Sequence, residues 1–560
     1  MNNINSWKNI QWKIIEEKVF YLQLRIYKAA TNQEYEKMYK LQKILIKSKS
    51  AKFLSVRKVT QDNDGKRIPG VDNVLIKTPS EKFGLSNQLR LDGKSSPIKH
   101  VFIKYSDGKF RPLGIPTIQD RAKQMLAYLA FCPQWEASFE ASSYGFRPGR
   151  SIDDAMEALF LEISKKSKWI LNANISKSLD KINHQYLIEK CNTFPDLLKQ
   201  IRAWLEVGIL DGEQFAFPEI GTPEGGVILP LLVNIILHGL REHLDNFINR
   251  LRSYSSNYIE SFTYIRYADN FILMHPNGEI LKNLEKETSK FLKPIGLKLD
   301  PIRTKKVHTL KNTEEFSMGF SFLDFDIIQY ATKVKQIKIR SKNKKGSKRG
   351  FITLITPSKE SIKKHKQKLR KIIHSYRGVD QKRLIQLLNP VIRKWAYSKR
   401  SQMASKVFQD LDTYLWLLLW KWCRYRHRKM SKIKLKEKYW HVEGKRNWIF
   451  GIKNNSKIQI RLQIHSKILI KRHLKVKDNA SPFDGNSLYW ADRAVKSLSI
   501  SSKKARLIRK QKGQCAICKR YFLPDDIIQL CNSRHKAIGY KNLTSNIYVA
   551  HYYCHLSKTV

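Results

Sequence analysis

The sequence predicts a multidomain protein of the α+β class, and three observations support this prediction. The chain has 560 residues, too many for a single hydrophobic core, so roughly three or four domains are expected. Apolar residues follow a helical period on both flanks of a middle region, about 100–330, in which strand-like and helix-like patterns are mixed. Hydrophobic residues make up 42% of the chain, the usual fraction for a globular protein, so each domain can bury a core.

The net charge points to a polyanionic partner. The chain has 105 Lys and Arg residues against 48 Asp and Glu residues, which gives a net charge of +57. Nucleic acid is the expected partner, because counterions are released for each phosphate that a protein neutralises. An anionic membrane is the alternative, but no apolar run reaches the ~18–20 residues of a spanning helix, so we expect no membrane partner.

The N-terminal elements are predicted to be helices. Over residues 10–58, apolar side chains recur at spacings of three and four, beginning with Trp12, Ile15 and Val19. A loop is predicted over 60–73, where Asp, Asn, Gly and Pro are frequent.

A domain boundary is predicted at residues 331–350, which hold nine basic residues and no acidic residue. Residues 357–440 are again predicted as helices, rich in Lys, Trp and Leu. An Asn- and Lys-rich connector follows from about 441 to 510, and the terminal residues form a small Cys- and His-rich module.

Four of the seven cysteines lie in the last 46 residues, which predicts a local metal site in a reducing compartment instead of a disulfide framework. The module contains two closely spaced ligand pairs, Cys-x2-Cys and His-x2-Cys, and four nitrogen or sulphur ligands suit tetrahedral zinc. The alternative is a reduced cysteine pair packed in a small core. We predict a structural Zn²⁺ held by Cys515, Cys518, His551 and Cys554.

The stretch SFTYIRYADNFILM, residues 261–274, is predicted as a β-hairpin. Apolar and aromatic residues flank a polar turn at Asp269 and Asn270. Both residue types tolerate left-handed backbone conformations, so this hairpin needs no metal ion to form.

Four blocks resemble, in order, the reverse-transcriptase domain of group II intron-encoded proteins. They are FRPLGIPTIQDRAKQ (110–124), SSYGFRPGRS (142–151), GTPEGGVILPLLVNIILHGL (221–240) and YIRYADNF (264–271). In addition, LNPVIRKWAYSKR (388–400) and LDTYLWLLLWKWCRYRH (411–427) resemble the thumb, or maturase domain X, of that family. The resemblance covers about residues 7–558.

The resemblance implies a right-hand polymerase architecture with a helical thumb and a small zinc-type ββα module. The implied domains are an N-terminal helical extension of the fingers (1–95), reverse-transcriptase-like fingers and palm (96–330), a thumb or maturase domain X (331–440), a basic connector (441–510) and an HNH-like zinc module (511–560).

In that family, three aspartates hold two Mg²⁺ ions, one on a strand and two in a Y-A-D-D hairpin, and Mg²⁺ prefers carboxylate oxygens. The resemblance places Asn174 at the strand position and Asp269 and Asn270 in the hairpin. Asp269 keeps its carboxylate, whereas Asn174 and Asn270 are degenerate metal-ligand positions. Mg²⁺ is therefore expected as a cofactor only if the polymerase site is active.

Three further positions depart from the family pattern. Leu179 stands where the family has an aromatic gate against ribonucleotides, Glu224 turns GTPQGG into GTPEGG, and Asp324 replaces a glycine of the primer-grip block FLGF. The five departures together imply a polymerase site without activity, although the backbone-shaping glycines and prolines of PLGIP and YGFRPGR are kept. The nucleotide-site scaffold that the resemblance implies is Arg111, Leu179, Glu224, Gly225 and Lys306.

Basic helical stretches with interleaved aromatic residues form the predicted RNA-binding surface, because recognition of RNA by shape uses phosphate contacts and stacking. For any single Lys the alternative is a solvated helix face, and the Trp and Leu residues at helical spacing are expected in the core instead of in stacking platforms. The predicted RNA-binding residues are Lys363, Lys364, Lys366, Arg370, Lys371, Arg393, Lys394, Arg424, Arg426, Arg428 and Lys429.

The C-terminal module resembles the HNH endonuclease module found in many of these intron proteins. That family needs adjacent histidines, one of them a general base, where this chain has Cys531 and Asn532. The family residues Asn546 and His555 are present. Without the base, hydrolysis lacks a proton acceptor, so the resemblance implies an inert finger that binds DNA or RNA.

Three functions remain after these observations. The preferred one is a maturase that binds group II intron RNA and assists its folding and splicing, with inactive polymerase and endonuclease sites. The alternative is an active RNA-directed DNA polymerase and endonuclease of a mobile intron. The third is a decayed product without a function. The helix patterns argue against decay, because they stay regular along the chain. DNA is a further candidate partner, and a dimer is a candidate assembly.

The frequent use of Lys, Ile and Asn is typical of an A+T-rich genome. We therefore expect an organelle-encoded protein of a plastid (chloroplast), with a mitochondrion or a bacterial cytoplasm as the alternatives. The first residues, MNNINSWKNIQWK, contain no signal core or cleavage site, which agrees with synthesis in the compartment where the protein works.

Overall fold

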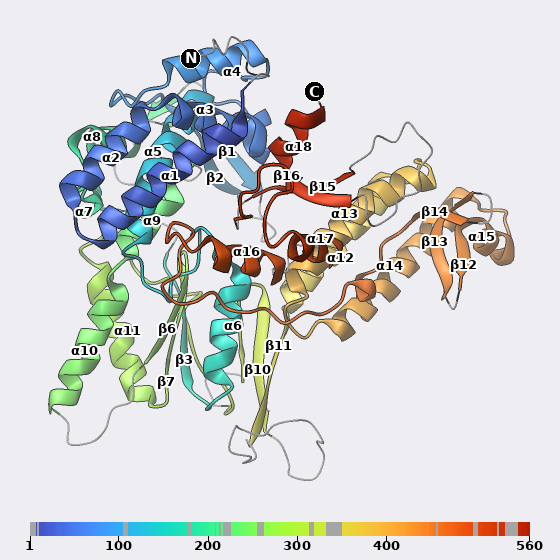
Figure 1. Cartoon of the computed structure of the whole chain (residues 1–560). Helices are drawn as coiled ribbons and strands as arrows, with labels where there is room; N and C mark the ends of the chain where they lie inside the picture. The colour runs from blue at the N-terminus through green and yellow to red at the C-terminus, as the bar shows by residue number, and fades with distance from the viewer. Residues whose placement is uncertain are drawn as a thin grey trace.

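The structure is a computed structural model (Figure 1). It describes residues 7, 10–104, 110–176, 182–207, 209–211, 214–216, 226–254, 262–312, 318–331, 350–444, 446–454, 457–496, 502–523, 526–532 and 547–559. Four of the predicted site residues lie outside this part of the chain, namely Leu179, Glu224, Gly225 and Asn546, as does most of the predicted boundary 331–350.

The N-terminal residues form three helices, as predicted: α1 (Trp12–Thr31), α2 (Tyr35–Lys47) and α3 (Lys49–Arg57). All three pack against the long helix α5 (Ile118–Glu136), and Ile15, Val19 and Ile26 lie on the buried face of α1. The predicted loop contains two short helical turns before α4 (Pro79–Gln88), which begins with a capping box made by Thr78 and Glu81.

A small sheet next to these helices has the order β2-β1-β4-β5. Its strands are β1 (Ile98–Lys104), β2 (Phe110–Ile115), β4 (Ile209–Asp211) and β5 (Gln214–Ala216). Four further helices belong to this half of the molecule: α7 (His184–Cys191), α8 (Pro195–Leu205), α9 (Leu229–Leu237) and α10 (Leu240–Tyr254). Residues of α7, α8, α9 and α10 join those of α1, α3 and α5 in one hydrophobic core.

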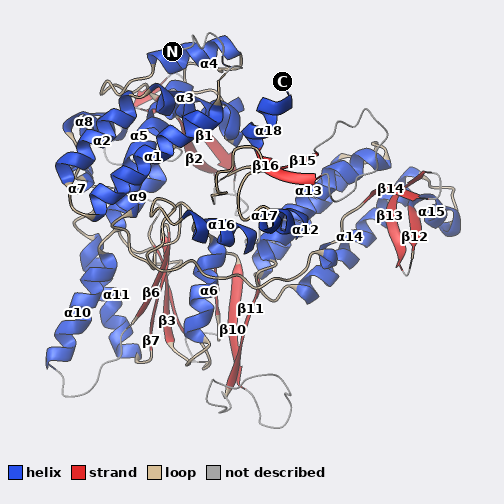
Figure 2. Cartoon of the chain, in the orientation of Figure 1, coloured by secondary structure: helices blue, strands red, loops and turns tan. Residues whose placement is uncertain are grey.

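The palm is a four-stranded antiparallel sheet with the order β6-β7-β3-β8. Figure 2 shows β3, β6 and β7 together in the lower part of the view. Its strands are β3 (Trp169–Asn174), β6 (Thr263–Tyr267), β7 (Asn270–His275) and β8 (Lys305–His308). Helices α6 (Ile152–Ile163) and α11 (Gly278–Leu292) contribute to separate cores. Successive residues of β3 join different cores, Ile170 that of α6 and Leu171 that of α11, as side chains of a strand alternate between faces.

A third sheet leads into the thumb. It has the order β11-β10-β9 and consists of β9 (Phe320–Phe322), β10 (Phe325–Ala331) and β11 (Phe351–Pro357). The thumb helices follow where the sequence predicts helices, as α12 (Lys359–Ser375), α13 (Gln381–Lys399), α14 (Ser405–Arg426) and α15 (Lys432–Tyr439). Leu369, Leu388 and Leu419 belong to their shared core.

Residues 441–510, which the sequence predicts as a basic connector, contain strands and helices. The first part of this segment is an antiparallel sheet at the end of the thumb, made of β12 (Trp440–Glu443), β13 (Arg446–Asn454) and β14 (Lys457–Arg461). Two helices follow, α16 (Ser487–Lys496) and α17 (Ser502–Lys510).

Residues 471–496, here called the strap, run from the thumb across the palm. Lys471 N donates to the Arg400 carbonyl at the end of α13, and Phe483 packs 6.5 Å from Phe20 of α1. Trp490 of α16 is fully buried against Gly149, where a Cβ would lie 2.6 Å from the indole. The strap therefore contacts thumb, palm and N-terminal helices together.

The C-terminal module has the predicted strand–strand–helix order: β15 (Ile528–Asn532), β16 (Ile547–His551) and α18 (Tyr552–Thr559). It packs on the N-terminal helices, with Arg520 3.4 Å from Glu16 and the Tyr553 ring 6.0 Å from that of Trp12. Figure 1 shows α18 beside the blue N-terminal helices. Among the described residues, every helix is too short or too polar to cross a membrane.

Candidate functional site

The β6–β7 hairpin carries the centre of the candidate site. Ala268 and Asp269 form its turn, with Ala268 at φ +56°, and Asn270 is already the first residue of β7, paired with Tyr267. The prediction of the turn at Asp269 and Asn270 is thus wrong by one residue, because the left-handed position falls on Ala268. As a strand residue, Asn270 has a side-chain direction fixed by the sheet.

Asn270 lies directly opposite Asn174, the last residue of β3. Asn174 Nδ2 donates a hydrogen bond to Asn270 Oδ1, and Asn270 Nδ2 donates to Asp269 Oδ1 at 2.9 Å. Asn174 is only 7% exposed. The three positions that the resemblance assigns to metal ligands therefore meet, and an amide–amide–carboxylate chain of hydrogen bonds joins them.

This donor set does not fit two Mg²⁺ ions. Mg²⁺ demands near-octahedral oxygen ligands and binds carboxylates in preference to amides. Here the set contains one carboxylate, and an oxygen of that carboxylate accepts from the Asn270 amide. Three aspartates at the same spacing would repel one another unless cations lay between them, whereas the two amides attract each other and the carboxylate.

The backbone around the three residues is fixed from two directions. Ile175 N donates to the Asp269 carbonyl at 2.9 Å, and Asp300 N donates to the Asn174 carbonyl at 2.8 Å. On the other side, the turn rests on the YGFRPGR segment, since a Cβ on Gly145 would lie 2.3 Å from Ala268 N. Glycine at 145 is what allows this close approach.

A buried polar network that the sequence analysis missed lies behind the turn. The fully buried Arg266 donates to Asn234 Oδ1 at 2.9 Å, and Asn234 donates to the Gly145 carbonyl at 2.8 Å. Burial would raise the pKa of Glu140, but a hydrogen bond from His238 and the charge of Arg266 outweigh it and hold that pKa at about 2. The available signal was an arginine inside an otherwise apolar strand, YIRY.

The position that the resemblance assigns to the primer grip lies in a tight turn. Leu323 and Asp324 connect β9 to β10 with φ of +47° and +67°, backbone conformations that a glycine adopts without strain. The Asp324 carboxylate lies 3.5 Å from Nζ of the buried Lys399, at the end of thumb helix α13. Burial lowers the pKa of Lys399, and the charge of Asp324 partly offsets this. The substitution thus adds a contact between palm and thumb.

Two of the residues that the resemblance assigns to a nucleotide site lie on strands. Arg111 is on β2, paired with Ile103. Lys306 is on β8 opposite Leu171, and its Nζ forms an ion pair with Glu285 of α11 at 2.7 Å.

The predicted RNA-binding residues lie mostly on exposed faces of the thumb. All are exposed except Lys366 and Arg426. Arg426 instead donates to the carbonyls of Arg377 and Val379 and lies over the Trp422 ring, so it joins helix α14 to the α12–α13 turn. Arg428, Lys429 and Lys434 line an open depression of about 840 Å³ beyond α14.

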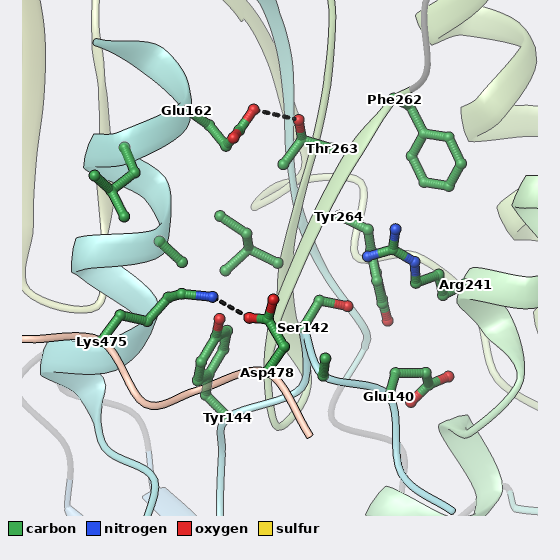
Figure 3. A pocket seen from close by; sticks show the side chains of 14 residues that line it. Glu140, Ser142, Tyr144, Glu162, Arg241, Phe262, Thr263, Tyr264, Lys475 and Asp478 are labelled. Atoms are coloured by element: carbon green, nitrogen blue, oxygen red, sulfur yellow. Dashed lines mark hydrogen bonds and ion pairs between the residues drawn. The ribbon is translucent and has the colours of Figure 1, made fainter. Parts of the chain in front are cut away.

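A second pocket, of about 610 Å³, lies beside the edge strand β6, between α6 and the strap (Figure 3). Each of the three carboxylates that line it has a cationic neighbour: Glu140 has Arg266, Glu162 has Lys168 at 3.1 Å, and Asp478 has Lys475. The pocket is thus built from satisfied ion pairs, and we assign it no catalytic role.

The four predicted zinc ligands come together in the C-terminal module. One ligand atom from each of Cys515, Cys518, His551 and Cys554 lies within 4.8 Å of the others. His551 Nδ1 lies 3.3 Å from Cys518 Sγ, and Nε2 of the same ring lies 3.0 Å from Asp526 Oδ2. A carboxylate that orients a histidine in this way is typical of metal sites. Hydrogen bonds from Cys518 and Cys554 lower the pKa of Cys515, and the thiolate is the metal-binding form.

The positions that the resemblance assigns to the nuclease histidines face different surroundings. Cys531 is 2% exposed and belongs to the core of the module, with Phe522 and Val549. Asn532 is exposed beside it on β15, and His555 is half-buried on α18. A buried thiol whose pKa is raised by desolvation is poorly placed to accept a proton from water.

Comparison with protein families matches three consecutive parts of the chain. Residues 7–89 match the N-terminal domain of reverse transcriptase, and residues 102–339 match reverse transcriptase (RNA-dependent DNA polymerase). Residues 362–440 match the group II intron, maturase-specific domain. The fold and these matches define a class of protein, a reverse transcriptase joined to a maturase domain.

Known relatives agree. Protein YkfC of Escherichia coli is 27% identical over 53% of this chain and 86% of its own. Group II intron-encoded protein LtrA of Lactococcus lactis is 34% identical over 28% of this chain and 26% of its own, and Maturase-like protein 1 of Euglena gracilis is 27% identical over 52% and 62%. This chain thus spans most of the first relative but less than two thirds of the other two. It contains reverse-transcriptase domains followed by a group II intron maturase-specific domain, and its relatives include a group II intron-encoded protein and a maturase-like protein.

Proposed function

We propose that this protein is a group II intron maturase: it binds intron RNA and assists its folding and splicing, and its polymerase-like and endonuclease-like centres are inactive. The observation that carries the proposal is the hydrogen-bonded chain of Asn174, Asn270 and Asp269. Two-metal nucleotidyl transfer needs cations at this point, whereas here the three side chains hydrogen-bond to one another without them. Splicing is catalysed by the folded intron RNA, so the protein needs a complementary shape and positive charge. This chain has kept both features.

The alternative, an active RNA-directed DNA polymerase and endonuclease, is supported by the intact palm sheet and by Asp269. Primer extension on an RNA template in Mg²⁺ tests it. We expect no processive cDNA from the unaltered protein, because losing metal ligands removes most of such a rate enhancement. The variant Asn174→Asp/Asn270→Asp serves as the comparison, and Asp269→Asn as the background. Processive cDNA from the unaltered protein that Asp269→Asn abolishes would refute the proposal.

Splicing of the host intron at low Mg²⁺, with and without protein, tests the maturase activity. We expect a protein-dependent gain and intron binding that weakens with salt, since neutralised phosphates release counterions. Lys363→Gln/Arg370→Gln, on the exposed face of α12, should reduce both. Lys286→Gln/Lys290→Gln, which removes the same charge from exposed positions of α11, is the matched control. No protein-dependent gain and no salt-sensitive binding would favour a decayed product.

The C-terminal module fits a structural zinc site. Three cysteines and one histidine form a closed tetrahedral ligand set for Zn²⁺, which would hold β16 and α18 against the Cys515–Cys518 turn. Cys531 and Asn532 supply no general base, which supports a nucleic-acid-binding finger for DNA or RNA instead of a nuclease.

The compartment we propose is an organelle, with a plastid ahead of a mitochondrion or a bacterium. Relatives named as intron proteins come from a bacterium and from yeasts, and relatives named maturase-like protein come from Euglena. The A+T-rich codon signature of the chain supports the organelle among these.

A further inference from the structure

The structure assigns a stacking site for an unpaired nucleobase to the outer end of the thumb, an inference that rests on the proposed function for its RNA partner. The site is a cavity of about 140 Å³ lined by residues of α14 and of the sheet β12–β14. Figure 1 shows this sheet at the outer end of the thumb. Three indoles line the cavity, those of Trp416, Trp440 and Trp448. The polar side chains in the lining are Asn447, Arg461 and Asp412, and the Asp412 carboxylate accepts hydrogen bonds from the backbone of His465 and Ser466.

The indoles form one cluster of which only part is needed for the core. Trp440 is 4% exposed and belongs to the thumb core. Trp416 stacks on Trp420 at 5.6 Å, and Trp448 stands nearly perpendicular to Trp416 at 5.7 Å. Trp448 nevertheless remains 42% exposed. Trp440 on β12 thus belongs to the core, whereas Trp448 on β13 presents a large aromatic surface to solvent.

The backbone at Trp448 has a strained conformation that places the indole in this position. In the β12–β13 pairing, His441 is opposite Ile449 and Glu443 is opposite Arg446, so Asn447 and Trp448 together face the single residue between His441 and Glu443. This is a β-bulge, which re-aims side chains. Trp448 occupies its left-handed position at φ +64°, where glycine is the usual residue. Strain of this kind persists where it positions a functional side chain.

The positive charge around the tryptophan cluster favours a nucleic acid as the partner. Between residues 421 and 461 the sequence has fourteen Lys or Arg residues and two acidic residues, Glu437 and Glu443. Glu443 is paired with Arg461 at 2.7 Å, and Lys436 Nζ lies 4.8 Å from the centre of the Trp448 ring. Aromatic rings inside a cationic surface are typical of sites that bind single-stranded nucleic acid, where bases stack and the backbone meets the charges. Bases within a duplex are already stacked, so the ligand is an unpaired base.

Binding of the full chain to two RNAs tests this inference. One is a ten-nucleotide single-stranded oligo(A), and the other is a blunt RNA duplex with a similar number of phosphates. We expect Trp448→Ala to weaken binding of oligo(A) roughly tenfold, within the range for one stacked base, with little change for the duplex. Trp448→Phe should keep most of the affinity. An oligo(dA) arm separates RNA from DNA as the source of the base.

Three further variants make the result specific. Trp448→Gly removes the indole and relieves the left-handed backbone, so its loss of affinity cannot come from strain. Leu417→Ala removes another exposed apolar side chain of the thumb and should leave oligo(A) binding unchanged. Lys436→Gln should instead lower the salt dependence for both RNAs.

Equal affinity of Trp448→Ala and the unaltered protein for oligo(A) would overturn the inference, as would an equal loss for oligo(A) and duplex, which would make the surface purely electrostatic. If the unaltered protein bound neither RNA, the proposed function would itself fail.

Discussion

The Asn270 side chain makes hydrogen bonds to two other side chains, those of Asn174 and Asp269. Its removal therefore changes the contacts of all three residues. The bond to Asn174 joins two strands whose paired residues are 96 positions apart in the chain, and the bond to Asp269 holds the turn. A buried amide that loses its partner costs about 1–3 kcal/mol, more than the bond contributes when it is made.

Asn270→Ala should therefore destabilise the palm by about 1–3 kcal/mol, because it leaves the buried Asn174 amide without its acceptor. Asn270→Asp keeps an acceptor for Asn174 but places a second carboxylate beside Asp269, so it should destabilise the protein at low ionic strength and recover when Mg²⁺ is added. The measurement is the denaturant midpoint with and without Mg²⁺. Gln185→Ala, which removes an exposed side-chain bond to Glu189, is the control. An unchanged midpoint for Asn270→Ala would show that the hydrogen-bonded chain does not hold the site.

At this scale the sequence could identify the three aligned positions, but it could not show that they bond to one another. That bond depends on the register between β3 and β7. This register is determined by the pairing of two segments that lie far apart in the sequence. The turn was misplaced because a non-glycine residue with positive φ, Ala268, is uncommon and carries no sequence signal.

Among the elements, the strap depends on one buried carboxylate. Asp154 Oδ1 accepts from Arg493 at 2.6 Å, from His473 at 2.9 Å and from Val476 N at 2.7 Å. Burial would raise the pKa of Asp154, but the hydrogen bond from His473 and the charge of Arg493 outweigh it and hold that pKa at about 2. Asp154 also begins helix α6, through its capping box with Ser151. One side chain thus starts a palm helix and binds the strap to it.

Asp154→Asn should release the strap, at a cost of roughly 3–5 kcal/mol, since a buried cation loses its partner. In the unaltered protein this stabilisation is present above about pH 4 and is lost as the pH falls towards 2, because the folded pKa lies below the ordinary value. Limited proteolysis within residues 471–496 measures the release. Asp492→Asn, which breaks an exposed pair with Lys496, should leave cleavage unchanged. Equal protection of the Asp154→Asn strap would contradict this role.

Elements with a strong apolar period were predictable, and those without one were not. Helices α1–α3 and α12–α15 follow the spacing of Leu, Ile and Trp along the chain. The strap has few such residues, and its order comes from polar contacts with Asp154, Arg150 and Glu157, which are more than 300 positions away. Polar contacts between distant residues leave no periodic pattern in the local sequence, so the sequence predicts the strap as part of a connector.

Across the whole molecule, the C-terminal module closes onto the N-terminal helices. Arg57 of α3 is buried, lies over the rings of both Trp12 and Tyr553, and pairs with Glu16 at 2.6 Å. Arg520 reaches the same glutamate. Tyr553 donates from its hydroxyl to Asp62. The C-terminal module therefore forms an interface with the N-terminal helices.

Cys518→Ser should lower the zinc content of the purified chain from about one per molecule to near zero, because a structural site needs all four ligands. The module should then open and expose the Trp12 and Tyr553 surface, which increased protease cleavage after residue 510 would reveal. Cys531→Val removes a buried cysteine outside the ligand set and should keep the zinc. Full zinc occupancy in Cys518→Ser would refute the assignment, and a chelator should reproduce the effect of the substitution.

The contact between Asp62 and Tyr553 spans 491 residues, and this has a consequence during translation. At the usual speed of protein synthesis the first helices leave the ribosome roughly half a minute to two minutes before their C-terminal partner exists. In that interval Trp12 and the Arg57 guanidinium are without the Tyr553 ring that later covers them. A chain released before α18 is made would keep that surface open, so the docking of α18 distinguishes chains that contain this helix from chains that lack it for any chaperone or protease that recognises exposed aromatic residues.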